Sequence, residues 1–175
     1  SSPFATVTGN TKCIVILINF NDTTNSSAHT PAYFYDLILN ASKSSMSKYF
    51  NDSSFATFNI SGDVTTKFYT ASHNESYYGM YESSSPQVNG YGNTQNLTYE
   101  AINAADADID FSKYDSDSDG KVDHLIIVHA GKDDANDGDG TGPGGDPQVW
   151  SHAWALNSLQ TQLDGKWLNK YTVLS

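Results

Sequence analysis

The chain has 175 residues, a length at which one domain buries a sizeable hydrophobic core, and we expect residues 1–175 to form a single domain. Its 9 basic and 20 acidic side chains give a net charge of -11, which argues against nucleic acids and anionic membranes as partners. No apolar run reaches the roughly 18 residues of a membrane span, and no signal peptide is recognisable, as expected of a processed or subcloned chain.

The first third of the chain predicts a buried strand followed by helical structure. Residues 12–20 form a continuous apolar run, typical of a central strand buried on both faces. Cys13, the only cysteine, lies in this run, so we expect a buried, inert thiol and no internal disulfide. Thr30 and Pro31 form a helix start, an N-cap followed by proline at the first helical position. The apolar spacing that follows predicts one helix broken near Asn40, or two helices.

The rest of the chain alternates between strand-like, helical and loop-like segments. Residues 55–62 and 64–70 alternate apolar and polar positions, as in a hairpin or two consecutive strands. Residues 73–93 are rich in Tyr, Ser and Gly and predict a long loop. A helix, two strand-like segments, a turn and the start of a last strand follow, at residues 98–105, 122–130, 148–156, 164–165 and 171–174. We therefore predict an α/β fold with a twisted, mostly parallel sheet and two or three helices.

Residues 115–123 have the pattern of a calcium-binding loop. Acidic residues occupy alternate positions, and Gly120 follows where the loop needs a sharp turn. Carboxylates on one tight turn repel one another unless a hard cation holds them, and calcium accepts roughly six to eight oxygen ligands. The predicted calcium ligands are four aspartate side chains, the last of them direct or through water, and one backbone carbonyl: Asp115, Asp117, Asp119, Asp123 and the carbonyl of Lys121.

The loop departs from helix–loop–helix calcium sensors after its glycine. Ile126 occupies the position of the usual bidentate Glu, and the β-branched and apolar residues from Val122 to Val128 predict a buried strand. We therefore expect a calcium loop that leads into a central strand. The alternative is a solvated acidic turn without a metal.

Residues 131–147 are too rich in Gly, Pro and Asp to form a helix or a strand. A flexible surface loop is one interpretation, and a second cation site is the other. The candidate ligands of that second site are Asp133, Asp134, Asp137 and Asp139. The glycines are not followed by Lys-Ser/Thr, so the stretch does not predict a phosphate-binding loop.

Seven Asn-x-Ser/Thr triplets favour a secreted or cell-surface protein. They begin at Asn21, Asn25, Asn40, Asn51, Asn59, Asn74 and Asn96. Each is a glycan acceptor if the chain meets the glycosylation machinery. Extracellular calcium, at about millimolar concentration, would also fill a loop of modest affinity.

Several short motifs are weak alone but occur in a specific order along the chain. They are Asn19-Phe20-Asn21-Asp22, Ser47-Lys48-Tyr49-Phe50, Tyr77-Tyr78-Gly79, Phe111-Ser112-x-Tyr114-Asp115, Val122-Asp123-His124, Val128-His129-Ala130-Gly131 and Trp150-Ser151-His152. In this order they resemble the N-terminal lobe of the immune-inhibitor-A-like secreted zinc metallopeptidases. The resemblance covers nearly the whole chain. It implies a zincin-like fold, a parent enzyme that uses zinc to cleave peptide bonds, and peptide or protein substrates.

The resemblance also implies a catalytic element that this sequence lacks. Zincins carry His-Glu-x-x-His on a helix, where two His ligands share one face and the Glu is the general base. None of the five histidines begins this motif: His29, His73, His124, His129 and His152. The zinc helix should follow the strand begun by residues 171–174. We therefore expect the front part of a catalytic domain, with no catalytic residue of its own, inactive without the missing C-terminal part.

The remaining histidine and tryptophan residues leave two questions open. His124 and His129 lie five apart on a predicted strand and face opposite ways, so we expect no joint zinc site. Trp150, Ser151 and His152 suit an edge strand that binds substrate backbone in a cleft, or a strand that enters the core. The aromatic content also suits an alternative function, a non-catalytic calcium-binding surface or adhesion module. A His-Glu-x-x-His motif further along the gene would favour the protease.

Overall fold

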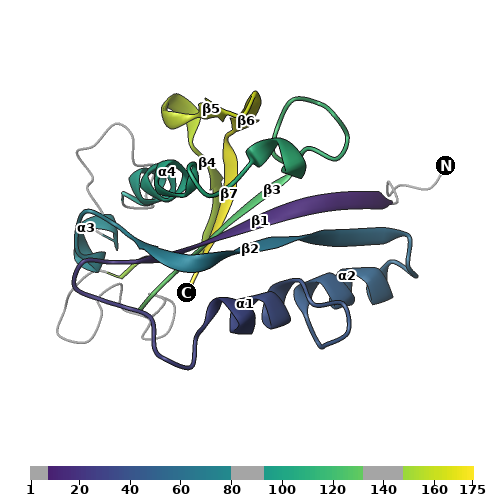
Figure 1. Ribbon diagram of the computed structural model, residues 1–175, viewed down its shortest axis with the longest axis horizontal. Coiled ribbons are helices and arrows are strands. Elements are labelled where there is room, and N and C mark those ends of the chain that lie inside the picture. The colour runs from purple at the N-terminus through teal and green to yellow at the C-terminus, as the bar shows by residue number, and fades with distance from the viewer. Residues whose placement is uncertain (1–7, 80–92, 132–147) are drawn as a thin grey trace.

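The computed structural model describes residues 8–79, 93–131 and 148–175, and these form a mixed, mostly parallel five-stranded sheet with helices on both faces (Figure 1). The strand order is β2-β1-β3-β7-β4. The strands are β1 (Gly9–Asn19), β2 (Phe58–Thr70), β3 (His124–His129), β7 (Lys170–Leu174) and β4 (His152–Ala155). Only β4 is antiparallel to its neighbour. The predicted α/β class with a mostly parallel sheet is confirmed.

Strand β1 is an interior strand, as its apolar run predicts. It pairs with β2 on one side and with β3 on the other. Its side chains alternate between two cores, with Ile14, Ile16 and Ile18 on what we call the upper face and Cys13, Val15 and Leu17 on the lower face. The thiol of Cys13 is fully covered, and burial raises its pKa to about 12. An inert thiol is the consequence.

The lower face carries two helices, α1 (Pro31–Ile38) and α2 (Met46–Ser53). The predicted start of α1 is confirmed, because the Thr30 hydroxyl oxygen accepts a hydrogen bond from the Tyr33 N–H at 3.2 Å. The predicted break is also present. Asn40 donates to Asp36 through its side chain and accepts from the Ser42 N–H, which ends the helical pattern.

Residues 58–70 form one long strand, β2, so the prediction of a hairpin or two strands is wrong. Gly62 interrupts the alternation of the sequence, but β2 continues through it beside β1. The φ angle of Gly62 is 153°, and a Cβ there would lie 1.8 Å from the carbonyl oxygen of Cys13. This glycine therefore permits close approach of two strands and does not mark a turn.

A bulge is the second interruption in β2. From Val15 to Leu17, β1 advances two residues, while β2 advances four, from Val64 to Phe68. The Thr65 hydroxyl fills the resulting gap in the ladder, accepting from the Leu17 N–H at 3.0 Å and donating to the Lys67 carbonyl at 2.9 Å.

The upper face carries α4 (Thr94–Ala105) and the hairpin of β5 (Thr161–Leu163) and β6 (Lys166–Leu168), as Figure 1 shows. Helix α4 begins four residues before the predicted helix and buries Leu97, Ala101 and Ile102. A short helix, α3 (Glu75–Gly79), lies in the predicted loop 73–93, the rest of which falls outside the described residues. The described part thus contains four α-helices, where the sequence predicted two or three.

The turn at Asp164 and Gly165 is confirmed, with φ angles of 49° and 76° and a two-residue hairpin between β5 and β6. The predicted strands 122–130, 148–156 and 171–174 correspond to β3, β4 and β7. Of the loop 131–147 and its possible second cation site, only Gly131 is described. No helix in the described part of the chain has the length and apolarity to cross a membrane.

Candidate metal centre and the edges of the sheet

The acidic loop connects a 3-10 helix, Phe111–Tyr114, to β3 and is folded around Asp115. The carboxylate of Asp115 accepts hydrogen bonds from the backbone N–H groups of Asp119 (3.0 Å) and Gly120 (3.1 Å). Ser118 and Gly120 have φ angles of 61° and 87°, in the left-handed region that Gly adopts without strain. The Asp115 side chain has no exposed area.

Three of the four predicted carboxylate ligands converge. Asp115, Asp117 and Asp123 each offer one oxygen within 4.8 Å of the others. Asp119 stands apart from this group, and its carboxylate accepts from its own loop, the N–H of Lys121 at 2.9 Å and the ammonium of Lys121 at 2.7 Å. The sequence predicted that four aspartates converge, and in the structure three of them do, while Asp119 lies outside the group.

Asp123 is the best anchored member of the group. It accepts from the Thr11 hydroxyl at 3.0 Å, from the Lys12 N–H at 2.9 Å, and from both the N–H and the hydroxyl of Ser116. Burial alone would raise the pKa of Asp123, but these hydrogen bonds from Ser116, Lys12 and Thr11 outweigh it and lower the pKa. The carboxylate is therefore held in its ionised form.

Lys166 is a member of the site that sequence reasoning missed. Its ammonium lies 2.6 Å from Oδ2 of Asp115 and is the main reason that the pKa of Asp115 is below its usual value. Lys166 begins β6, and the same hairpin is tied to the loop through its backbone. The Trp167 N–H donates to the Gly120 carbonyl at 2.9 Å, and the Val122 N–H donates to the Trp167 carbonyl at 3.0 Å. No local pattern signals a partner 51 residues away.

The donor set fits calcium and not zinc. Carboxylate and carbonyl oxygens are the ligands that calcium takes, whereas zinc sites are built mainly from Cys and His. Among residues 8–79, 93–131 and 148–175, no other cluster of three or more His, Cys, Asp or Glu side chains has metal-binding geometry. His124 and His129 lie on opposite faces of β3, as predicted.

Strand β4 lies at the edge of the described sheet and begins at His152, the last of the three candidate cleft residues. It pairs with β7 alone within the described sheet, and Trp150 and Trp154 are 53% and 38% exposed. His152 is positioned by Nδ1 at 2.6 Å from the Trp150 carbonyl oxygen and by Nε2 at 3.2 Å from the Thr94 hydroxyl. Of the two placements left open by the sequence, the segment has the edge placement.

A second acidic pair lies at the opposite end of the sheet. The Asp22 carboxylate, after β1, accepts from the Glu75 N–H at 3.1 Å. The Glu75 carboxylate packs against Gly131, where a Cβ would lie 2.5 Å from Oε2. Burial raises the pKa of Glu75 to about 7, and the charge of Asp22 adds to the rise.

Comparison with known proteins assigns the fold to a class of peptidases. Residues 29–173 match the family described as immune inhibitor A peptidase M6, catalytic domain, and the chain belongs to this family. Immune inhibitor A from Bacillus thuringiensis subsp. alesti is 27% identical over 132 residues, which are 67% of this chain and 19% of that protein. The pre-pro-metalloprotease PrtV from Vibrio cholerae serotype O1 is 34% identical over 128 residues, 64% of this chain and 13% of that protein. The chain thus spans less than a fifth of the length of either relative.

Proposed function

We propose that this chain is the calcium-stabilised N-terminal part of the catalytic domain of a secreted zinc metalloendopeptidase. The observation that carries the proposal is the family match over residues 29–173, together with a relative named as a metalloprotease. The match favours the protease over the alternative of a non-catalytic adhesion module. Peptides or proteins outside the cell are the proposed substrates of the parent enzyme.

The proposal assigns zinc to a part of the parent outside residues 1–175. None of the five histidines in the sequence begins His-Glu-x-x-His, and the candidate cluster among the described residues contains carboxylates and no histidine. In the parent, bound zinc would lower the pKa of a water molecule and polarise the scissile carbonyl. Residues 1–175 would contribute the sheet, and we assign the pairing with substrate backbone to the segment Trp150, Ser151 and His152, because β4 lies at the edge of the described sheet.

Calcium has a structural role in this proposal. Bound by Asp115, Asp117 and Asp123, with the Lys121 carbonyl and Asp119 as further ligands, it would offset the repulsion between the converging carboxylates. The loop also holds the β5–β6 hairpin through Lys166 and Trp167, so calcium would stabilise that side of the upper core.

Secretion rests on the seven Asn-x-Ser/Thr triplets and on the calcium loop. None of the seven asparagines is buried: Asn21, Asn25, Asn40, Asn51, Asn59, Asn74 and Asn96. Mass spectrometry of the protein from its native source tests this point, and seven unmodified sites would remove the support that the triplets give.

Thermal unfolding with and without a chelator tests the calcium assignment. A ligand that binds only the folded state at a hundredfold excess over its Kd stabilises it by about 2.7 kcal/mol. Asp117→Ala should abolish most of this gain, whereas Asp52→Ala, which removes an exposed acid on α2, should retain it. Equal melting temperatures with calcium and with chelator would refute the site.

A protein-hydrolysis assay tests whether peptide-bond cleavage requires a part of the parent outside residues 1–175. We expect no casein cleavage by zinc-supplemented residues 1–175, and chelator-sensitive cleavage by the parent polypeptide. Robust, chelator-sensitive turnover by residues 1–175 alone would refute the proposal and point to an unrecognised site near His124, His129 or His152. A parent gene without His-Glu-x-x-His would leave the adhesion module as the better function.

A further inference from the structure

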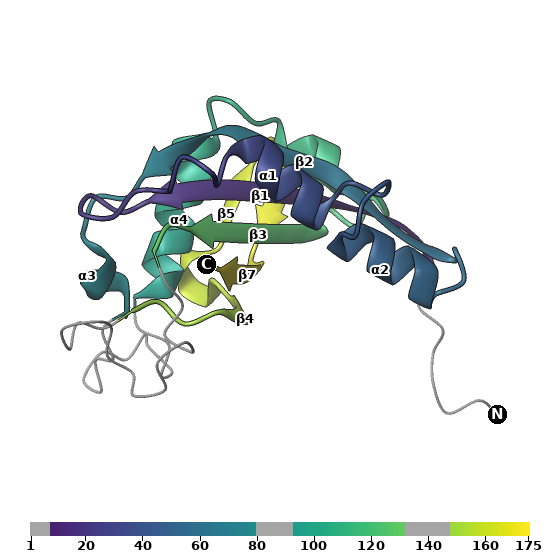
Figure 2. The same ribbon diagram turned by 90° about the horizontal axis from the view of Figure 1, so that it is seen from below.

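The register of β4 determines which of its backbone groups face away from the sheet. Figure 2 shows β4 at one border of the sheet, beside β7. Just after the strand, the Leu156 N–H donates to the Asn169 carbonyl at 2.8 Å, so these residues form a hydrogen-bonded pair that continues the antiparallel ladder. Hydrogen-bonded and non-hydrogen-bonded pairs alternate along such a ladder. Ala153 and Ala155 therefore belong to non-hydrogen-bonded pairs and direct their backbone N–H and C=O groups away from β7.

One of these outward carbonyls is occupied by a side chain. Gln95, in the first turn of α4, donates from Nε2 to the Ala155 carbonyl oxygen at 2.6 Å. Its neighbour Thr94 lies with its hydroxyl oxygen 3.2 Å from Nε2 of His152. The first turn of α4 is thus connected to β4 at two points, and the Gln95 amide takes the place that an N–H of an added strand would occupy.

Ala153 is the exposed outward residue of the strand. A strand added to a sheet edge pairs with every second residue of that edge, because only those residues direct N–H and C=O outward. A substrate that pairs along β4 would therefore meet Ala153 and, two residues further on, Ala155. At Ala155 it would find the N–H group available and the carbonyl bound to Gln95.

The bond from Gln95 is not required to satisfy a buried group. Ala155 is only partly buried, so water can reach this end of β4 and would solvate the carbonyl in the absence of the side chain. A donor that replaces water at an accessible carbonyl adds little to stability, but it excludes any other donor from that acceptor. The contact is therefore better suited to limiting what pairs with the edge than to holding the fold together.

We propose that Gln95 is a positioning residue for substrate in the parent enzyme, because it ends the substrate-binding edge of β4 at the Ala155 carbonyl. Substrate backbone would pair with Ala153 and with residues before it, and the substrate N–H that faces Ala155 would stay unbound. The inference rests on the proposed function, since it requires a parent that cleaves peptides bound along β4.

A scan of N-methylated peptides tests the inference in the parent polypeptide. The probe is a casein peptide that spans a bond the parent cleaves, methylated at one backbone nitrogen at a time. Each methyl group removes one N–H donor, so KM should rise wherever that donor binds an outward carbonyl of β4. In the unsubstituted parent we expect a sensitive position opposite Ala153 and no sensitivity at the position that faces Ala155.

Gln95→Met removes the amide donor and keeps the length of the side chain. The released Ala155 carbonyl should accept a substrate N–H, so we expect KM for the unmodified peptide to fall about three- to tenfold with kcat unchanged. A new sensitive position should appear two residues from the existing one. Asn103→Leu is the matched control, because the Asn103 amide donates to the Tyr99 carbonyl at 2.7 Å within α4 itself. It should change neither KM nor the pattern.

Gln95→Lys provides the rescue. Its ammonium supplies a new N–H donor at similar reach, so the pattern of the unsubstituted parent should return. In residues 1–175, Gln95→Met should melt within about 4 °C of the unsubstituted chain, as expected for one accessible hydrogen bond in a chain of this length. A much larger drop would show that Gln95 holds the fold together and would overturn its role as a limit on the edge.

The failures of the inference and of the proposed function are distinguishable. Sensitivity at the Ala155 position in the unsubstituted parent would show that substrate displaces Gln95, which overturns the inference. Active Gln95→Met with an unchanged pattern, or with one common change in KM for every peptide, would also overturn it. A parent that cleaves no peptide at all would refute the proposed function, and the inference with it.

Discussion

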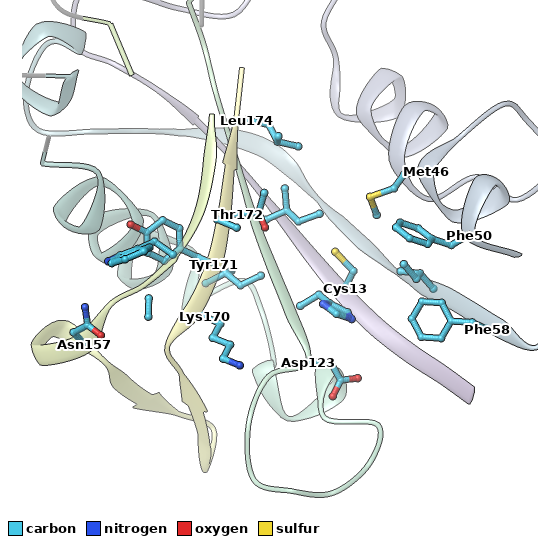
Figure 3. A pocket seen from close by; sticks show the side chains of 17 residues that line it. Cys13, Met46, Phe50, Phe58, Asp123, Asn157, Lys170, Tyr171, Thr172 and Leu174 are labelled. Carbon is cyan, nitrogen blue, oxygen red and sulfur yellow. The ribbon is translucent and has the colours of Figure 1, made fainter. Parts of the chain in front are cut away.

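The upper and lower faces of the sheet are packed by different means. On the upper face, helices α3 and α4, the 3-10 helix Phe111–Tyr114 and the β5–β6 hairpin enclose a core that includes Ile127, Leu168 and Val173. On the lower face, α1 and α2 cover β2 and β1, and the described residues leave β3 and β7 beside an open groove of about 930 Å³, lined by Met46, Ile126 and Ala153 among others (Figure 2 and Figure 3). The two faces belong to the same strands, so the difference lies in what covers them and not in the sheet.

This difference separates an enclosed core from one that borders an open groove among the described residues. The upper core is closed at one end by the acidic loop, which holds the hairpin through Lys166 and Trp167. The lower core has no comparable closure among the described residues. Equal truncations should therefore cost more in the enclosed upper core than beside the groove, where the surroundings leave no closed cavity.

Two neighbouring isoleucines on β3 offer the largest expected effect. Ile127 is fully buried in the upper core, and Ile126 is 6% exposed and lines the groove. We expect Ile127→Ala to lower the free energy of unfolding by about 3–4 kcal/mol, because it leaves an enclosed cavity. Ile126→Ala should cost about 1–2 kcal/mol in residues 1–175, since the space it leaves joins the groove. Urea unfolding measures both, and equal losses would contradict the distinction between the faces.

Lys166→Met probes the closure of the upper face. Without calcium, the variant leaves the covered carboxylate of Asp115 without its cationic partner, and we expect a loss of about 2 kcal/mol. With saturating calcium the loss should be much smaller, because the ion replaces the missing positive charge, and calcium affinity should rise. Lys121→Met is the control, since Lys121 pairs with the exposed Asp119 and should change stability by less than about 1 kcal/mol. The measurement is the melting temperature of each variant as calcium is added. Equal responses of Lys166→Met and Lys121→Met would contradict the role of Lys166 as the cationic partner of Asp115.

The features that sequence reasoning predicted are those with local causes. The apolar run of β1, the Thr30 cap and the Asp164-Gly165 turn each depend on residues within a few positions. The continuity of β2 through Gly62 was missed because the reason for that glycine is the carbonyl of Cys13 on the neighbouring strand.

The same limit applies to the acidic loop. Its aspartate spacing is visible in the sequence, and three of the four carboxylates converge. Their partners Thr11 and Lys166 lie 112 and 51 residues away from the groups they bind, Asp123 and Asp115. Pairing of this kind follows from strand register and from the path of a hairpin, neither of which leaves a periodic signal in the sequence.

Glu75→Gln tests the other end of the upper face, where α3 packs. The pKa of Glu75 is raised to about 7 in the folded protein, mainly by burial, from an ordinary value of 4.5. Between these two pH values the folded state retains a proton that the unfolded state has lost, so this group lowers stability as pH rises, and the full penalty is present above about pH 7. Because Glu75 is partly exposed, we expect a gain of only about 1–2 kcal/mol for Glu75→Gln at pH 8 and almost none at pH 4.5.

Unfolding of the unsubstituted chain and of Glu75→Gln at several pH values measures the gain in stability. Contributions from the other titrating groups cancel when the two free energies are subtracted. Asp52→Asn, an exposed acid on α2, is the control and should show no comparable pH dependence. A gain for Glu75→Gln that is the same at pH 4.5 and pH 8 would show that the residue is not protonated by the fold.

Thr30→Ala should have the smallest effect on stability. Thr30 caps α1, which lies on the covered half of the lower face. The substitution removes the hydroxyl that accepts the Tyr33 N–H, and loss of such a cap costs about 1 kcal/mol, whereas Thr30→Ser should restore the bond and most of the stability. Helix α1 packs against β2, so its cap senses nothing of the groove. The losses for Thr30→Ala and Ile126→Ala should therefore add in the double variant to within about 0.5 kcal/mol. A coupling energy well above this value would show that the two halves of the lower face form one cooperative unit, and the boundary that we draw at β1 would be in the wrong place.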